Sequence, residues 1–475
     1  MITSITPSAI KTIPLEFQLH DKDSVNLFVQ SFNYLPFIYI SKVNDPTNVP
    51  QISGTTIDPH DIIYVKLHNS KFLPEIELYC DDSKGILFND LYPFDHDTII
   101  SIFIKSNSEN IMPIRMDFRV TEYETIKSGD RNPKYLMRGL LDVDELHFST
   151  YESRKGSSYD IIKQIALELK LGWASNVQSS NDKMTWINPG DTYKEFIKDI
   201  TRYSYISEDA FIWTFIDFYY NLNYVNVQLE LNQYTKSEQQ SKANPLIVKN
   251  ENEGNILLYL TNNNAFKGTN QHIAKFNIVN QSFKVNLAKF YKMKGTWYIK
   301  NTNTVIKKPL KELESDQEKL GPGEGALRQL ADKKARLYDQ NTNDEYFIGK
   351  MDTDSKHENY SLAKISNKFN LDNLQKMKML ITLHQVNFSI KRFQNIRIEI
   401  YNPDAMFSYD ANTKTPLNNI NTKLSGFWFV TGINYLYSKN GGIEQEITLM
   451  RRDLSINYGV GGDQQNDFRK IINTK

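Results

Sequence analysis

Alternation of apolar and polar residues dominates the first 125 positions of the chain. Ile76 and Leu78 alternate with glutamates, and Met116 and Phe118 alternate with charged residues. A period of two places one side of a strand on a core and the other side in water. Turn residues such as those at 81–85 separate the runs. This series of short strands, broken by Pro, Gly, Ser and Asn, predicts a barrel or sandwich rather than a parallel α/β sheet.

The pattern becomes helical between residues 156 and 205. Ser157 and Asp160 form a Ser-x-x-Asp capping box, after which apolar residues recur every four positions as far as Gly172. A second amphipathic helix is predicted to start near Thr192. Both apolar stripes indicate helices that pack on neighbouring strands.

Strands return after these helices. A polar stretch at 233–255 has the composition of a linker. The remaining elements are predicted from the same patterns: aromatic-rich strands at 210–231, strands at 256–260, 273–279 and 283–291, a charged helical pair at 310–320 and 326–337, and strands at 381–388, 396–400, 427–437 and 443–452. The glycines of Asn440-Gly441-Gly442 predict a hairpin turn between the last two strands.

These elements indicate a β-rich α+β chain with a nested domain order. Two strands at 210–231 cannot close a barrel alone, so we expect them to pair with the strands of 379–452. Residues 247–374 are then an insertion carried by that second barrel. The expected domains are a first β-barrel at 1–122, a mixed domain with two amphipathic helices at 123–207, a discontinuous second barrel at 208–246 and 375–453, a peripheral insertion at 247–374, and a C-terminal tail at 454–475.

Composition supports a folded chain with more than one core. A single core stops growing at about 250–300 residues, and this chain has 475 residues. The 27 Tyr and 26 Phe residues argue against disorder, which is poor in aromatic residues. The 56 basic and 56 acidic residues give zero net charge. That balance argues against a simple basic nucleic-acid binder.

Cysteine content and apolar runs limit other classes of site. Cys80 is the one cysteine, so an intrachain disulfide or a thiolate metal cluster is excluded. The N-terminal residues lack a signal-peptide pattern, and no apolar run approaches the roughly 18 residues of a membrane helix. We therefore expect a soluble protein made in a cytoplasm.

Motifs for catalysis or cofactor binding are absent. Zinc-protease, nucleophile-elbow and P-loop signatures do not occur, and the eight histidines have no ligand spacing. Asp352 and Asp354 begin like a calcium loop, but Lys356 and His357 occupy the positions of the next ligand and the turn glycine. The glycine-rich residues 321–325 lack the lysine of a phosphate loop and carry an acid, which favours a break between two helices.

Acidic residues of the first barrel are the remaining candidates for chemistry. Paired carboxylates could run glycoside hydrolysis, and the densest set is Asp81, Asp82, Asp95 and Asp97. Turns commonly use Asp to bond the local backbone, so we interpret this set as structural. The sequence predicts no enzyme, no catalytic, cofactor-binding or metal residue, and no cofactor.

Several blocks of the chain resemble the baseplate hub proteins of contractile-tailed phages. The blocks are residues 156–176, 181–187, 193–205 and 210–226, the closing pattern Gly426-Phe427-Trp428-Phe429-Val430-Thr431-Gly432, and the final Thr448-Leu449-Met450-Arg451-Arg452. The likeness covers about residues 70–230 and 380–455 and fades over 247–374.

This resemblance implies a homotrimer whose subunits each carry two similar tube-forming β-barrel domains, related to the hub part of type VI secretion spike proteins. Such a hub adapts a six-fold tail tube to a three-fold spike, in a virion that is assembled in the host cytoplasm. The implied partners are other copies of the chain, the central spike, the tail tube protein, baseplate wedge proteins and the tape measure protein. DNA would pass through the channel without specific binding, and no membrane partner is implied.

Two other function classes stay open at this stage. Aromatic-rich strands also suit a phage fibre or adhesin that binds glycans, although such fibres usually show repeats or coiled coils. A spike-associated hydrolase is the third class, and it would lose its activity when one carboxylate is replaced.

Overall fold

A computed structural model describes most of the predicted strands and helices of the chain. The described residues are 3–5, 37–43, 52–104, 114–127, 132–207, 210–230, 256–259, 271–280, 294–299, 304–309, 345–351, 356–357, 359–375, 377–383, 390, 392–393, 395–400, 424, 426–439 and 442–451. The predicted charged helices at 310–320 and 326–337, the glycine-rich residues 321–325, Asp352, Asp354 and the tail at 454–475 lie outside them.

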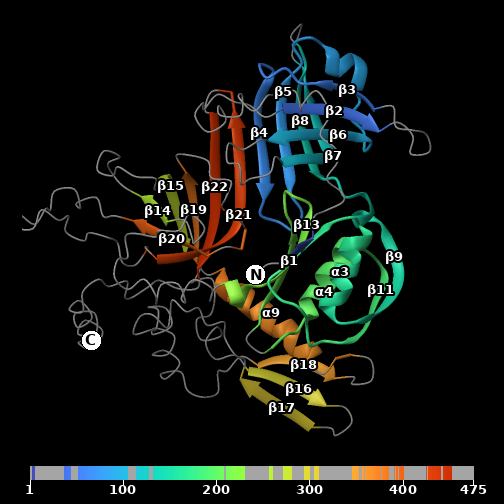
Figure 1. Cartoon of the computed structure of the whole chain (residues 1–475), viewed down its shortest axis with the longest axis vertical. Coiled ribbons are helices and arrows are strands. Elements are labelled where there is room, and N and C mark those ends of the chain that lie inside the picture. Colours follow the sequence, from blue (N-terminus) through green and yellow to red (C-terminus); the bar gives the residue numbers. More distant parts are fainter. Residues whose placement is uncertain are drawn as a thin grey trace, which may run out of the picture.

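A 13-stranded sheet forms the largest part of the described structure, and it confirms the β-rich prediction. Its order is β20-β14-β15-β19-β22-β21-β4-β5-β8-β7-β6-β2-β3 (Figure 1). The first half of this sheet consists of β2 (Phe37–Val43), β3 (Ile52–Thr56), β4 (Ile62–Asn69), β5 (Glu75–Asp81), β6 (Thr98–Ile104), β7 (Ile114–Ile126) and β8 (Lys134–Leu141). The second half consists of β14 (Ile256–Tyr259), β15 (Gln271–Asn280), β19 (Met377–Leu383), β20 (Asn395–Ile400), β21 (Gly426–Ser438) and β22 (Gly442–Arg451).

The second half closes on itself. In addition to its pairing with β14, strand β20 pairs antiparallel with β21, so six strands form a closed ring of pairings. The predicted hairpin between the last two strands is confirmed, since Ser438 pairs with Gly442 and that glycine has a φ of 71°. A positive φ suits a residue without a Cβ.

Three smaller sheets accompany the large one. They are a four-stranded sheet of β1 (Thr3–Ile5), β10 (Gly172–Ser175), β13 (Asn221–Asn226) and β12 (Ile212–Ile216), a ribbon of β9 (Ser149–Gly156) and β11 (Met184–Thr192), and a three-stranded sheet of β17 (Thr304–Pro309), β16 (Lys294–Ile299) and β18 (Glu345–Met351). The helical segments are a π-helix at Leu87–Leu91, a 3₁₀ turn at Asp144–His147, α3 (Ser158–Glu168), α4 (Tyr193–Tyr203) and α9 (Tyr360–Leu374).

The two predicted amphipathic helices are confirmed together with their caps. Ser157 caps α3 by accepting a hydrogen bond from the backbone N–H of Asp160, and Thr192 caps α4 in the same way. Such caps satisfy backbone donors that have no partner within the helix. The periodicity also predicts Gly172 as the C-cap of the first helix, but Leu169 caps α3 and Gly172 begins β10.

One boundary and two strand pairings differ from the sequence prediction. β7 runs to Ile126 and β8 pairs with both β5 and β7, so the first half of the sheet extends past residue 122. β12 and β13 pair with each other and with β10, not with the strands of 379–452. β14 and β15 lie within 247–374, yet they pair with β20 and β19. Strand pairing depends on long-range contacts that periodicity does not report.

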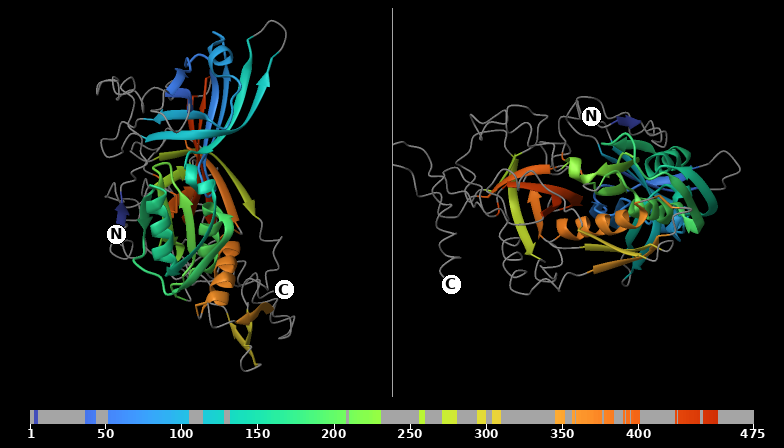
Figure 2. Two further views of the ribbon diagram at one scale, coloured as in Figure 1. Left: turned by 90° about the vertical axis from the view of Figure 1, so that its right-hand side faces the viewer. Right: turned by 90° about the horizontal axis from the view of Figure 1, so that it is seen from below.

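Buried side chains join the large sheet to the four-stranded sheet. Phe211, Phe215 and Val227 contact Phe393 and Phe429 of the second half in one apolar cluster. α9 packs along α4, and Figure 2 shows it beside the part of the chain that contains α3 and α4. No helix among the described residues is long and apolar enough to cross a membrane.

Candidate functional site

Of the acidic residues considered for catalysis, Asp82 has a structural role. Asp82 is buried and accepts hydrogen bonds from the backbone N–H groups of Leu87 and Phe88, which fixes the start of the π-helix. Asp81 ends β5 opposite Lys134. The backbone carbonyl of Asp95 accepts a hydrogen bond from the N–H of Thr98, and Asp97 Oδ1 is buried without a hydrogen-bond partner among the described residues. Among the described residues, His, Cys, Asp and Glu form no group that could hold a metal ion. The surfaces of the large sheet are the remaining candidates for a functional site.

The two halves of the large sheet have the same order of strands. The order β4-β5-β8-β7-β6-β2 in the first half corresponds to β15-β19-β22-β21-β20-β14 in the second half. The equivalent strands also follow one another in the same order along the sequence. The first four pairings are antiparallel in each half. The last pairing is antiparallel for β6–β2 and parallel for β20–β14, and β3 has no counterpart among the strands that the structure describes.

A register shift occurs at the same place in β7 and β21. Against β8, the register of β7 shifts between Val120 and Glu122. Against β22, the register of β21 shifts between Val430 and Gly432. Each shift places one extra residue in the strand, as in a β-bulge. Bulges bend a strand and change the direction of its side chains, and they are specific features of a sheet.

A second shift also recurs in equivalent strands. β4 shifts against β5 between Ile62 and Tyr64, and β15 shifts against β19 between Ile273 and Lys275. The two shared shifts fix an alignment of the halves residue by residue. The residue pattern alone shows no repeat, because the equivalent positions share strand register rather than residue identity. Two similar barrels are expected only from the resemblance to hub proteins.

The two halves meet where β21 pairs antiparallel with β4. Six residue pairs make this joint, from Ile433 opposite Asn69 to Ser438 opposite Tyr64. Only the C-terminal part of β21 takes part, since its first residues pair with β20. We call this pairing the internal joint.

The buried side chain of Arg392 forms hydrogen bonds to both sides of the internal joint at one end. The Arg392 guanidinium donates to the backbone carbonyls of Thr431 (2.6 Å), Lys71 (2.6 Å) and Ser70 (3.0 Å). It also donates to Asn69 Oδ1 at 3.2 Å. Burial lowers the pKa of Arg392 to about 9, although the nearby carboxylate of Asp217 acts in the opposite direction. One side chain thus connects the end of β4 to the shifted residue of β21.

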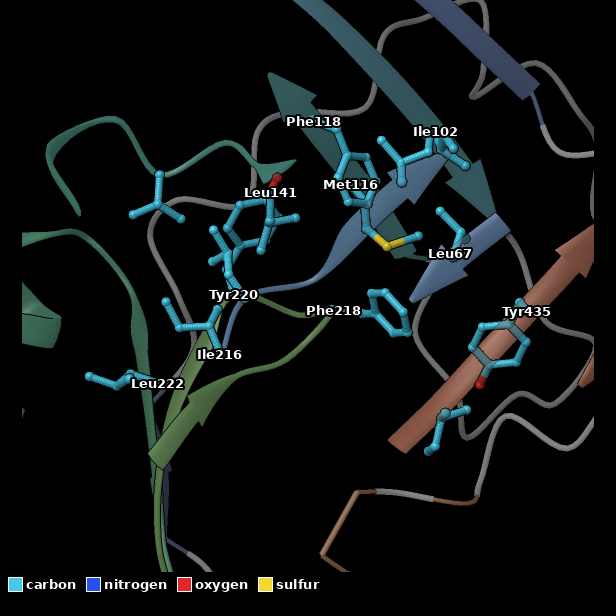
Figure 3. Packing of buried hydrophobic residues seen from close by; sticks show 14 of the residues in the cluster. Leu67, Ile102, Met116, Phe118, Leu141, Ile216, Phe218, Tyr220, Leu222 and Tyr435 are labelled. Carbon is cyan, nitrogen blue, oxygen red and sulfur yellow. The ribbon is translucent and has the colours of Figure 1, made fainter. Parts of the chain in front are cut away.

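Aromatic and aliphatic side chains fill the space beneath the internal joint. Leu67 of β4 lies opposite Tyr435 of β21, and the ring of Phe218 lies 5.9 Å from the Tyr435 ring (Figure 3). Met116 and Phe118 approach from the first half of the sheet (Figure 3). Burial of this apolar area stabilises the joint by about 25 cal/mol per Å².

Each half leaves one matching edge without a described strand. β6 pairs with β7 only as far as Arg119, so residues 121–126 carry no described strand on that side. β14 pairs with β15 only at Gln271 and His272, so residues 277–280 of β15 also have no described strand on that side. By the alignment of the halves, these edges correspond to the two edges that form the internal joint.

The polar face of the first half carries a row of paired charges. Arg138 bonds Glu122 (3.1 Å) and Glu77 (3.2 Å), and Glu77 also pairs with Lys66 (3.3 Å). Tyr64 donates its hydroxyl to Glu77 at 2.9 Å. Opposite charges therefore neutralise one another across four neighbouring strands, β4, β5, β8 and β7.

The pKa directions in this row agree with the pairing. Burial acts to raise the pKa of Glu77, but hydrogen bonds from Tyr64, Arg138 and Lys66 hold it below its ordinary value. Burial and the bond to Glu77 raise the pKa of Tyr64 to about 12. Hydrogen bonds to Glu122 and Glu77 raise the pKa of Arg138. Glu77 and Arg138 therefore stay ionised and paired at neutral pH.

Comparisons with known proteins find similar solved structures at low identity and with TM-scores below 0.5. No protein-family model and no curated protein matches the chain. Among solved structures, a tail protein from Neisseria meningitidis is similar at a TM-score of 0.46 and 8% identity, over 88% of this chain and 97% of that chain. The 43 kDa tail protein of prophage MuSo2 from Shewanella oneidensis is similar at 0.49 and 9%, over 89% and 100%. An Escherichia coli component of the type VI secretion system, described as similar to T4 bacteriophage tail proteins gp27 and gp5, is similar at 0.36 and 8%, over 82% and 73%.

Proposed function

We propose that the chain is a structural protein of a contractile tail, forming the homotrimeric hub of the baseplate. In this role the two halves of the large sheet are two tube-forming β-barrel domains, and α3, α4 and β9–β13 form the mixed domain between them. The hub joins a six-fold tail tube to a three-fold spike. Its partners are the tube, the spike, wedge proteins and the tape measure protein, and the virion is its location.

The duplication of the sheet is the observation that carries this proposal. Three chains with two equivalent halves give six equivalent units, which is the number that an adaptor between six-fold and three-fold symmetry needs. The sequence resemblance described above points to the same family of hub proteins. No catalytic step is part of the proposed role.

The paired charges on the polar face support a channel for DNA. A strongly basic wall would bind phosphates in a salt-dependent way and slow the passage of DNA. The row from Lys66 to Glu122 instead neutralises its charges within the chain. We propose that this face lines the channel.

The native mass of the purified chain tests the proposal. We expect a particle of three times 55.3 kDa in sedimentation or native mass measurements, and a ring in negative-stain images. A chain that stays monomeric at all concentrations, alone and with tail proteins, contradicts the proposal. A monomer that binds glycans would favour the adhesin class.

A further inference from the structure

The internal joint offers a template for contact between copies of the chain. It joins the edge of β21, which is the equivalent of β7, to the edge of β4, which is the equivalent of β15. We call these the β7-type edge and the β4-type edge. Within the described ranges, the same chain presents one more edge of each type, on β7 and on β15. Two different complementary edges on one chain are the requirement for a head-to-tail contact, which can close into a ring.

We propose that residues 123–126 of β7 pair antiparallel with residues 277–280 of β15 from a second copy. This inference rests on the proposed self-association and adds its location and register. The shared shifts align Tyr123 with Ile433 and Asn280 with Asn69, which are partners in the internal joint. The register that follows pairs Tyr123 with Asn280, Glu124 with Val279, Thr125 with Ile278, and Ile126 with Asn277.

The exposure of side chains at the two edges supports this pairing. Ile126 is 43% exposed and Val279 is 42% exposed, although both belong to strands of the main sheet. Ile278 is half-buried, whereas its equivalent Leu67 is fully buried beneath the internal joint. Pairing with a second copy would bury the side chains of both edges, as the pairing of β4 with β21 buries theirs.

Backbone hydrogen bonding argues in the same direction. A strand edge without a partner exposes a row of N–H and C=O groups that readily pair with another chain. Natural sheets usually protect such edges or close them. In Figure 2 (left) the hairpin of β7 and β8 (cyan) projects at the top of the first half.

Cysteine cross-linking in the full-length chain tests the location and the register. The double variant Glu124→Cys, Val279→Cys places thiols on directly opposed positions of two copies, whose Cβ atoms lie about 4.5–5.5 Å apart in such pairs. Cys80 is buried, and burial raises the pKa of its thiol, so the unmodified chain serves as the blank. The matched control is Glu124→Cys, Lys275→Cys, which moves one thiol four residues along β15.

Under mild oxidation we expect covalent dimers and trimers from the Val279 pair, with no larger species, and at least tenfold less product from the Lys275 pair. The native mass of each variant is measured before oxidation. A trimer that forms no cross-link at the Val279 pair, or forms it equally at the Lys275 pair, overturns the proposed joint while the proposed hub stands. A monomeric mass without cross-links overturns both.

Discussion

At the scale of single residues, Arg392 is a buried side chain that adds hydrogen bonds to the pairing between the two halves of the sheet. Its guanidinium satisfies three backbone carbonyls and one amide oxygen from β21 and from the end of β4. Its charged group also lies 4.3 Å from the centre of the Phe215 ring. Removing a partner from buried polar groups costs about 1–3 kcal/mol for each group left unsatisfied.

We therefore expect Arg392→Met to lower the free energy of unfolding by about 3 kcal/mol or more. Arg202→Met is the matched control, because Arg202 forms an exposed pair with Asp199 at the surface of α4. Urea unfolding followed by circular dichroism measures both. Equal stability of the two variants would contradict the role given to Arg392.

At the scale of elements, α9 is held to the end of α4 by two polar side chains. Asn367 donates to the carbonyls of Arg202 (3.2 Å) and Ser204 (3.1 Å), which lie at the C-terminus of α4. The His357 ring bonds the carbonyl of Tyr203 through Nε2 at 3.0 Å. Helix ends leave such carbonyls without partners, so the two side chains complete α4.

The docking of α9 is expected to weaken in acid. Burial lowers the pKa of His357 below 6.5, although Asp182 acts in the opposite direction, and Nδ1 has no hydrogen-bond partner among the described residues. The folded chain therefore favours neutral His357. The contribution of neutral His357 to the free energy of unfolding is fully present above pH 6.5. It is lost as the pH falls from 6.5 through the lower pKa of His357 in the folded state.

Urea midpoints at pH 7.5 and pH 5 measure this effect. We expect a smaller difference between the two pH values in His357→Gln, since the amide can still donate to Tyr203 and does not titrate. His147, whose pKa is also lowered by burial, contributes in the same direction and leaves part of the difference. An unchanged pH dependence in His357→Gln would refute the assignment.

Elements were predictable from the sequence wherever the signal is local. The alternation around Ile76 and Met116 predicted β5 and β7, and the Ser157 cap predicted the start of α3, because each signal involves residues only a few positions apart. The pairing of β4 with β21 joins residues more than 360 positions apart along the chain. Neither propensity nor periodicity reports such a contact. The role of Arg392 depends on the pairing of β4 with β21, and the role of Asn367 depends on the packing of α9 against α4.

At the scale of the whole molecule, the paired charges determine how the polar face meets nucleic acid. We expect the unmodified chain to bind duplex DNA negligibly at 50–150 mM salt, within the range where phosphate contacts dominate affinity. The double variant Glu77→Lys, Glu122→Lys removes the acids that pair with Lys66 and Arg138 on this face. It should bind DNA with an affinity that falls steeply as salt rises.

Fluorescence anisotropy of labelled duplex DNA measures that change. Glu168→Lys, Glu195→Lys is the matched control, because it gives the same net charge on the surface of α3 and α4. Equal binding by both double variants would mean that net charge alone is responsible, and the proposed channel face would lose its support.

The duplicated sheet also has a consequence for shortened chains. A fragment that ends near residue 230 keeps β2–β8 but loses β21, so the long edge of β4 becomes exposed to solvent. That fragment would carry both complementary edges on a single half. Half-length chains should then associate with one another in series, and six of them, rather than three, would complete one turn of the ring.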